Sequence, residues 1–431
     1  MALGGGTFLV QNKVLPGAYI NFVSINNASA TLSERGIAAL GIEADWGPSG
    51  EVFAVTSGEF QKESQKIFGY PYTHEKLKGL REIFANIHTL YAYRLNGDGK
   101  KAENEYATAK YPGLRGNDLS ISIGASVDEG SFDVKTLLNN KLVDKQKVKD
   151  VKDLKDNDFV DFKDTFTLTV MANKALTGGT NGEITGDSHQ EFLNKLEKYS
   201  FNALGCVTTD DVTKGLYINY TKRLRDDMGK KFQTVVYNKA ADYEGVVNVK
   251  NKALGKEAGL VYWVTGIVAG TPVNKSALNK KYDGEFEVDV NYKQAELEKA
   301  ILLGEFALHQ VGDDIRVLND INSLVTTNDT KGDVFKDNQT IRVIDQIAND
   351  IAVLFNTKYL GVVPNDKAGR VSLWADIVKH HEELEAIRAI EDFNDEDVKV
   401  FRGDSKKSVV VSDLVNVINA MEKLYMTVTI A

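Results

Sequence analysis

GIAALGI at residues 36–42 is an apolar run typical of a strand, and it opens a stretch in which strands and helices alternate. From Gly36 to Asn96 the pattern predicts one strand, two helices and a second strand, which is an α/β order. TSGE at residues 56–59 is a capping box for the first helix, and Gly69 lies where that helix should end. The second helix carries apolar residues at helical spacing, namely Leu77, Leu80, Phe84 and Ile87. We therefore expect an α/β core domain.

Residues 97–176 follow a different pattern. LSISI at residues 119–123 and FTLTV at residues 166–170 alternate as strands. A stretch dense in Lys and Asp lies between them at residues 141–158, and we interpret it as solvated surface because its charges nearly cancel. The sequence thus predicts a β-rich insertion that is entered through a hairpin turn at residues 96–99.

The α/β pattern resumes after Gly182. SHQE at residues 188–191 has the form of a second capping box, and it begins a helix that carries Phe192, Leu196 and Tyr199. Further strands are expected at residues 203–207, 234–237 and 246–249, with helices at residues 211–228 and 259–268. The insertion therefore interrupts the core domain.

A third region begins at the turn-rich residues 328–333. Two apolar stripes predict helices, one through residues 344–355 and the other through residues 371–387. Two short strands joined by a turn at Gly403 then predict a hairpin made of Val398, Lys399, Val400 and Phe401 with Ser408, Val409, Val410 and Val411. This region is an α+β domain.

Both ends of the sequence contain strand patterns. Near the C-terminus apolar residues alternate with Tyr and Thr, which predicts a half-buried strand that runs to the last residue. An edge strand exposes unpaired N–H and C=O groups, so it is either covered by its own fold or donated to another chain. We expect these segments to be intersubunit strand donors that land on the hairpin: Tyr19, Ile20, Asn21, Phe22 and Val23, and Leu424, Tyr425, Met426, Thr427, Val428, Thr429 and Ile430.

Composition excludes several classes of function. The 431 residues suggest two or three domains, and 42% apolar with 26% charged residues is ordinary for a folded protein. A net charge of -9 argues against a nucleic-acid partner. No stretch reaches the length of a membrane span, and residues 1–6 lack the features of a signal peptide, so we expect a cytoplasmic protein without membrane insertion. The single cysteine, Cys206, is interpreted as a buried strand thiol.

The candidates for catalysis are weak. Ser188 and His189 resemble a hydrolytic cluster, but there is no G-x-S-x-G and the same residues fit a helix cap. His380 and His381 are adjacent on a helix, where side chains point about 100° apart, so we expect one at the surface and one in the core rather than a shared metal. LTGGTNG at residues 176–182 lacks the pattern of a phosphate loop. We predict no catalytic residue, no cofactor and no metal.

Several segments in order resemble the contractile-tail sheath proteins of Gram-positive phages, defective phages and R-type bacteriocins. The resemblance covers the whole chain. It is carried by PGAYINF (16–22), DWGP (45–48), KYPGLRGND (110–118), LTGGTNG (176–182), RVID (342–345), YLGVVPN (359–365) and AMEKLYMTV (420–428).

The resemblance implies a structural protein that forms hexameric rings stacked around an inner tube, with terminal strands exchanged between subunits. It implies a subtilisin-like α/β core without protease chemistry, a β-sandwich insertion and a C-terminal domain that faces the tube. The implied partners are other copies of the chain, the tail tube protein, and baseplate and tail-terminator or collar proteins. Assembly would occur in the bacterial cytoplasm, as part of a virion tail or a released particle.

The expected domains are an N-terminal arm (1–27), the core (28–96 with 177–327), the insertion (97–176), the α+β domain (328–418) and a C-terminal arm (419–431). The helix at residues 371–387 and the residue after it carry charges that we expect to face the tube, although a solvated helix face explains them equally well: Lys379, Glu382, Glu383, Glu385 and Arg388. Two alternatives are a hydrolase that uses the core and a static tube or surface-layer protein.

Overall fold

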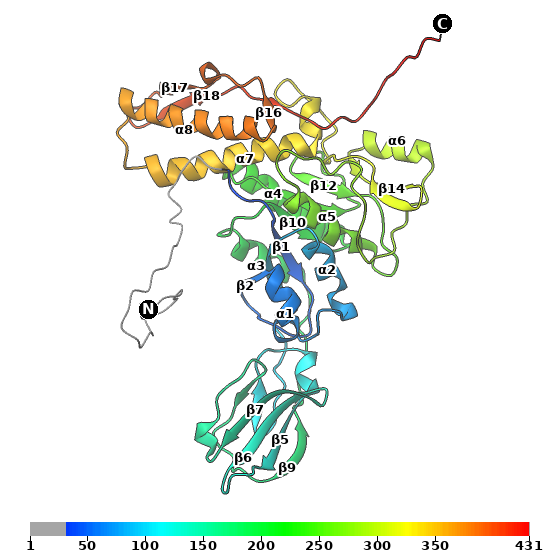
Figure 1. Ribbon diagram of the computed structural model, residues 1–431, viewed down its shortest axis with the longest axis vertical. Coiled ribbons are helices and arrows are strands. Elements are labelled where there is room, and N and C mark those ends of the chain that lie inside the picture. The colour runs from blue at the N-terminus through cyan, green and yellow to red at the C-terminus, as the bar shows by residue number, and fades with distance from the viewer. Residues whose placement is uncertain (1–31, 431) are drawn as a thin grey trace, which may run out of the picture. The chain divides into compact units, whose positions relative to one another are not determined.

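The computed structural model describes residues 32–430, and its larger unit is built on a seven-stranded sheet (Figure 1). The strands are parallel to their neighbours, except that the edge strand β2 runs antiparallel to β3. Their order across the sheet is β13 (Glu305–Phe306), β12 (Val246–Val249), β11 (Gln233–Tyr237), β10 (Ala203–Cys206), β1 (Ile37–Ile42), β3 (Thr89–Arg94) and β2 (Val52–Thr56). The predicted α/β character is confirmed, and the first apolar run lies near the middle of the sheet as β1. The sequence pattern missed β2, which lies between β1 and α1.

Helices cover both faces of this sheet. Along β1, Ala38, Leu40 and Ile42 belong to one hydrophobic cluster and Ala39 belongs to the other, because side chains of a strand alternate between faces. The first cluster receives α1 (Ser57–Phe68), α2 (Lys78–Phe84) and α5 (Leu260–Gly270), and the second receives α3 (Gly186–Leu196) and α4 (Asp211–Lys222).

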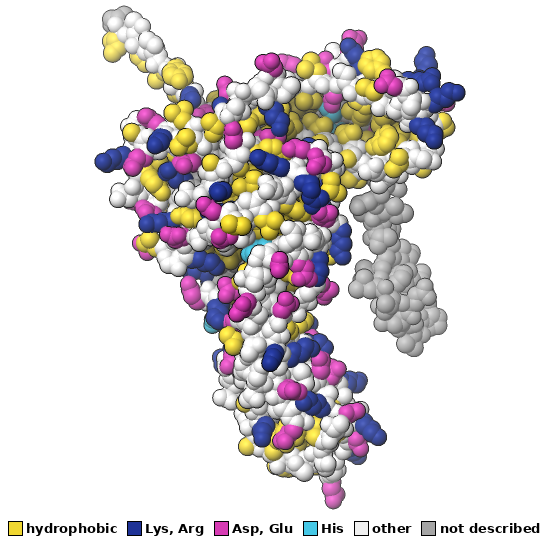
Figure 2. All heavy atoms as spheres, turned by 180° about the vertical axis from the view of Figure 1, so that it is seen from behind, with side chains coloured by type: hydrophobic (Ala, Val, Ile, Leu, Met, Phe, Trp, Pro, Cys, Tyr) yellow, Lys and Arg dark blue, Asp and Glu magenta, His cyan; other side chains and the backbone are white. Residues whose placement is uncertain are grey.

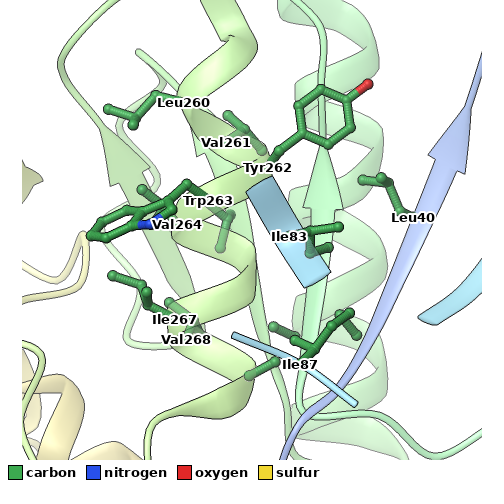
Figure 3. Packing of buried hydrophobic residues seen from close by; sticks show 14 of the residues in the cluster. Leu40, Ile83, Ile87, Leu260, Val261, Tyr262, Trp263, Val264, Ile267 and Val268 are labelled. Atoms are coloured by element: carbon green, nitrogen blue, oxygen red, sulfur yellow. The ribbon is translucent and has the colours of Figure 1, made fainter. Parts of the chain in front are cut away.

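Helix α5 is apolar around its whole circumference. Residues 260–269 are all buried, as expected for a helix in the interior of a large domain. In Figure 3, Ile83 of α2 lies between the side chains of α5 and Leu40 of β1. Helix α6 (Gln294–Leu302) and the hairpin of β14 (Leu308–Val311) and β15 (Asp314–Val317) complete the helices and strands of this domain.

The insertion consists of two small sheets around their own core. One has the order β7 (Lys141–Val148), β6 (Phe132–Leu138), β5 (Leu119–Ala125) and β9 (Met171–Ala175), and the other pairs β4 (Ala107–Ala109) with β8 (Val160–Phe162). Apolar residues from both sheets form one cluster, which gives a sandwich-like arrangement.

Polar contacts fix the junction between the insertion and the core domain. Arg94 is buried and donates from Nη2 to Asn181 Oδ1 at 3.2 Å, and Asn181 Nδ2 donates to Asp45 Oδ1 at 2.8 Å. Gly113 has φ of +133°, and a Cβ there would lie 2.0 Å from the Asp45 carbonyl oxygen, so this turn requires glycine. Segments far apart in sequence therefore meet in one junction.

Two predictions about the insertion are wrong, and one strand was not predicted. The strand expected at residues 166–170 begins only at Met171, where the ladder with β5 starts. The charged stretch contains β7, whose Lys145 pairs with Asp133 across the ladder at 2.9 Å, so a polar sequence still forms a strand when its partner strand supplies the hydrogen bonds. The turn at residues 96–99 does not form a hairpin. The strand before it, β3, pairs with β1 and β2, and the chain after the turn enters the junction.

The chain divides into two compact units: Glu34–Ala348 together with the residues from Val417 onward, and Asn349–Asn416 with the segment that ends at Ser33. Helix α7 (Asn338–Leu354) contributes to both units. The second unit contains α8 (Lys367–Ala386), β17 (Lys399–Arg402) and β18 (Val409–Ser412), packed around Leu354, Leu373 and Ile377. Two very short strands, β16 (Ile390–Glu391) and β19 (Asn416–Val417), are also present.

The expected helix caps are correct at one helix and shifted at the other. Thr56 and Glu59 form the predicted capping box of α1, and Gly69 ends it in the left-handed conformation. At α3 the N-cap is Thr185, and Ser188 is the residue that bonds back to it. In the described residues 32–430, no helix combines the length and apolar character that a membrane span requires. The expected domain boundaries and the likeness of the core to subtilisin stay predictions.

We predict that Thr56→Ala weakens the first turn of α1 by about 1 kcal/mol, because the Thr56 side chain accepts the amide hydrogen of Glu59. Amide hydrogen exchange at Glu59 should be faster in this variant. Thr56→Ser retains the hydroxyl and should exchange like the parent; equal exchange in all three proteins would contradict a role of the cap.

Candidate functional site

The C-terminal arm has no strand partner within the described chain: from residue 418, one residue before its predicted start, to residue 430 the chain pairs with no strand. Its apolar side chains are exposed, with Leu424 86%, Met426 73% and Val428 69% accessible (Figure 2). The predicted strand therefore has the alternating side chains of a strand but no strand partner in residues 32–430. An extended apolar segment of this kind is a candidate assembly element.

The arm begins at a fixed point on the first turn of α7. Gln339 Nε2 donates to the carbonyl oxygen of Ile418, and Gln339 Oε1 accepts from the amide of Ala420, each at 3.0 Å. This amide side chain bonds to the arm backbone as an adjacent strand would. Thr340 Oγ1 donates to Asn419 Oδ1 at 3.2 Å, so three consecutive residues of the arm are held.

A network of buried polar groups holds α7 in place. Asp320 pairs with Arg342, and both side chains are almost completely buried. Arg225 donates two hydrogen bonds to Asp345, at 2.6 and 2.9 Å. Burial alone would raise the pKa of Asp320, but Arg342 and further donors hold that pKa below its ordinary value. Removing one partner of such a pair leaves a buried charge, at a loss of about 3–5 kcal/mol.

The cap of α7 is part of the same network. Asp337 Oδ1 accepts the amides of Gln339 at 2.6 Å and Thr340 at 3.2 Å. Asn338 donates from Nδ2 to Asp320 Oδ1 at 3.1 Å. The sequence analysis did not identify the residues at the start of α7 that hold the arm and the helix cap. Their sequence, DNQT at residues 337–340, directly precedes an apolar stripe and is typical of a helix start.

The hairpin expected to receive strands is present. β17 and β18 pair from Lys399 with Ser412 to Arg402 with Val409. Each strand begins and ends one residue later than predicted. They form a two-stranded sheet, so within residues 32–430 each strand keeps one edge without a strand partner. The donor residues 19–23 lie outside the described residues.

Four family models together match almost the whole chain. They are the N-terminal region of domain III of the tail sheath protein Gp18 at residues 35–95, the phage tail sheath β-sandwich domain at residues 96–181, the central domain at residues 182–323 and the C-terminal domain at residues 330–431. The chain belongs to the phage tail sheath protein family.

Individual sheath relatives agree with this assignment. The phage-like element PBSX protein XkdK of Bacillus subtilis is 31% identical over 99% of this chain and its own full length. The sheath tail protein of Desulfitobacterium hafniense is 33% identical, with a TM-score of 0.80 over 95% of this chain and 99% of that chain. The contracted helical sheath of the anti-feeding prophage shares the fold, with a TM-score of 0.58 at 12% identity over 97% of this chain and 99% of that chain. The chain is thus a structural sheath subunit.

The RVID segment at residues 342–345, which carries part of the sheath resemblance, begins and ends with an ion-paired residue. Arg342 pairs with Asp320, and Asp345 pairs with Arg225. The charged residues expected to face a tube divide into two groups. Lys379 and Glu382 are exposed on α8, and Arg388 is exposed just beyond it. Glu383 and Glu385 accept the amides of Leu32 and Phe393, at 3.3 and 3.0 Å. Contact with a tube stays a prediction.

The expected split of the two histidines is wrong. Both are buried: His380 Nε2 contacts Asp350 of α7 at 3.0 Å, and His381 Nε2 contacts Asp413 at 2.9 Å. Helix α8 is covered on two sides, so adjacent residues both face protein. In the part of the chain that the structure describes, no group of three or more His, Cys, Asp or Glu side chains has the arrangement of a metal site.

The geometry does not support the hydrolase alternative. The Ser188 hydroxyl contacts Thr185 and the Glu183 carbonyl, each at 3.4 Å, while His189 Nδ1 contacts the Tyr217 hydroxyl at 2.9 Å. The two side chains thus have separate partners. Cys206 is buried in β10 as predicted, and burial raises the pKa of its thiol.

We predict that Gln339→Ala frees the start of the arm, because it removes both hydrogen bonds to the arm backbone. The amide of Ala420 should then exchange its hydrogen faster, whereas Gln339→Glu, which keeps the acceptor oxygen, should protect that amide better. Unchanged protection in Gln339→Ala would show that the anchor does not hold the arm.

We predict a pH-dependent stability contribution from Asp337. Burial and the negative charge of Asp320 raise the pKa of Asp337 from 3.8 to about 6. Because the folded pKa lies above the unfolded one, stability falls as pH rises from about 4 to 6, and above pH 6 the ionised group is destabilising.

Asp337→Asn keeps the capping oxygen and should therefore raise the free energy of unfolding above pH 6, on the order of 1 kcal/mol. The difference from the parent should disappear toward pH 4, as measured by denaturant unfolding at several pH values. A gain that does not change with pH would contradict the raised pKa.

Proposed function

We propose that the chain polymerises as stacked hexameric rings around an inner tube and contracts to drive that tube through a target envelope. The observation that carries the proposal is the exposed arm: residues 424–430 alternate aliphatic side chains with Tyr and Thr, and no strand in the described chain pairs with them. Membership of the sheath family supports it.

The proposed link between subunits is strand addition. The arm of one copy pairs with the hairpin of the next, and the N-terminal donors at residues 19–23 act in the same way. An eight-residue strand spans roughly 25 Å and each backbone hydrogen bond contributes about 0.5–1.5 kcal/mol net. One such link is modest, but a polymer repeats it in every subunit.

Contraction then needs no bound nucleotide. The extended polymer is metastable, and it relaxes to a state that buries more contact surface while the exchanged strands keep subunits linked. The proposed partners are the tail tube protein, along the exposed Lys379, Glu382 and Arg388, and the baseplate and terminator or collar proteins. Assembly takes place in the bacterial cytoplasm, and the product is a virion tail or a released particle.

Removal of residues 421–431 tests the proposal. The truncated chain keeps Ile418, Asn419 and Ala420, so the contacts with Gln339 and Thr340 remain and the fold should be unchanged. We expect the parent to form helical tubes in negative-stain electron microscopy, and the truncated protein to remain small in analytical ultracentrifugation.

Glu422→Gln in the full-length chain is the matched control. It alters the contact of Glu422 with Asn319, at 3.2 Å, but leaves the apolar alternation of the arm. This control should form tubes like the parent. Normal tubes from the truncated chain would refute the proposed role of the arm.

A further inference from the structure

A cavity lies at the carboxyl end of β1, in the unit that contains the seven-stranded sheet. Its volume is about 410 Å³, which is within the usual range of small-molecule sites. It is lined by residues 42–45 at the end of β1, by the first turn of α2 and by residues 254–256, which lead toward α5. Neither the proposed strand exchange nor the proposed contraction uses this cavity.

The position of the cavity in the sheet is one that favours ligand binding. The chain order reverses at β1: β3, which follows α1 and α2, pairs with one side of β1, and β10, which follows α3, pairs with the other side. Helices α2 and α3 belong to different hydrophobic clusters, so they cover opposite faces of the sheet. In open α/β sheets, ligands bind outside the carboxyl ends of the strands where the strand order reverses.

Aromatic and aliphatic side chains form the walls of the cavity. Tyr262 at the start of α5 packs against Gly79 of α2, where a Cβ would lie 2.6 Å from the Tyr262 ring, so this close approach requires glycine. Figure 3 shows the Tyr262 hydroxyl pointing away from Ile83. Leu77 is buried and Phe286 is partly buried, and both line the cavity. These walls offer apolar contact to a flat ligand.

Two lysines on these walls have only weak partners. Lys256 Nζ lies 5.0 Å from the centroid of the Tyr262 ring and 3.3 Å from the Tyr262 hydroxyl, and it forms no ion pair within residues 32–430. Lys78 Nζ lies 4.8 Å from the centroid of the Phe286 ring, and its carboxylate partner Glu75, at 3.5 Å, is 81% exposed. Exposed contacts of both kinds are weak, so these two ammonium groups are free to bind an anion in the cavity.

The other charged groups of the cavity are compensated or face water. Asp45 accepts hydrogen bonds from Lys76 and Tyr70, so the Asp45 and Lys76 charges offset each other. The carboxylates of Glu43 and Glu75 are exposed, where water and salt screen them. The cations that remain for a ligand are therefore the two lysines that lie over aromatic rings.

We propose that this cavity binds a small aromatic anion, with its ring against Tyr262 and Phe286 and its anionic group bound by the ammonium groups of Lys78 and Lys256. The walls supply apolar contact, and the lysines supply charge-assisted hydrogen bonds. A neutral aromatic molecule or an inorganic anion uses only one of the two. Asp45, on the wall of the cavity, also accepts a hydrogen bond from Asn181 in the junction with the insertion, so a bound ligand additionally stabilises the loop after β1.

Isothermal titration calorimetry on the full-length chain tests the proposal, with 2-naphthyl phosphate and 2-naphthoate as probes. We expect at least one of these anions to bind with a dissociation constant of about 0.1 mM or lower, and 2-naphthol and inorganic phosphate to bind at least about tenfold more weakly. If neither naphthyl anion binds below about 1 mM, the proposal is wrong.

Charge reversal of one lysine locates the bound probe. Lys256 is exposed and forms no ion pair within the described residues, so Lys256→Glu should fold like the parent, as circular dichroism melts will check. This variant should bind the probe about tenfold or more weakly. The matched control is Lys62→Glu, at an exposed lysine of α1 that does not line the cavity, and it should change the affinity by less than about twofold. Equal affinities in the two variants would overturn the assigned site.

Two further proteins separate this cavity from other apolar surfaces. Glu43→Gln removes a negative charge that lines the cavity and should strengthen binding of the probe. The chain truncated after Ala420 lacks the exposed apolar arm but keeps the cavity, so it should bind the probe like the parent. Loss of binding in the truncated chain would show that the probe binds the arm, and the proposal would be refuted.

Discussion

The buried ion pair between Asp320 and Arg342 fixes the point from which the C-terminal arm starts. A charge in the protein interior is costly unless an opposite charge and hydrogen bonds compensate for the lost water. Asp320 meets this requirement with Arg342, with the side-chain amide of Asn338 and with the amide of Ala277. The first turn of α7 is therefore held in one position, and Gln339 and Thr340 on that turn hold the arm. The start of the exposed arm thus depends on the buried pair of Asp320 and Arg342, through the helix turn that this pair holds.

Neither the arm nor the hairpin is a complete sheet within the described residues, because the arm has no strand partner and β17 and β18 pair only with each other. A two-stranded sheet is marginal in water by itself, and an exposed strand edge invites pairing with another chain. Proteins that stay monomeric usually protect such edges with charges, prolines or covering segments. Here the arm has exposed apolar side chains at every second position from Leu424 to Ile430, and β18 has an exposed Val411. Both features are expected in a subunit that completes its sheets with its neighbours.

Local patterns were sufficient for much of the fold. The strand at residues 37–42, the capping box of Thr56 and Glu59 and the buried helix at residues 260–270 depend on apolar spacing and on contacts a few residues away. The errors arose where distant partners decide the outcome. β7 is a charged strand because β6 pairs with it, and His380 and His381 are both buried because Asp350 of α7 contacts the first and Asp413 contacts the second. The N-cap of α3 is Thr185 and not the predicted Ser188, because Ser188 lies inside the first turn and its side chain bonds back to Thr185.

The sequence by itself determined the alternation of the arm, the hairpin after residue 398 and the sheath-type motifs, because each depends on residues that are close together in the sequence. Only the tertiary structure decided what those motifs do. Asp345 pairs with Arg225 across 120 positions of sequence, and Gln339 holds an arm that lies 79 positions away. Such contacts depend on which segments meet in space. Within the described residues 32–430 no strand pairs with the arm, and a strand is complete only when another backbone supplies its hydrogen bonds.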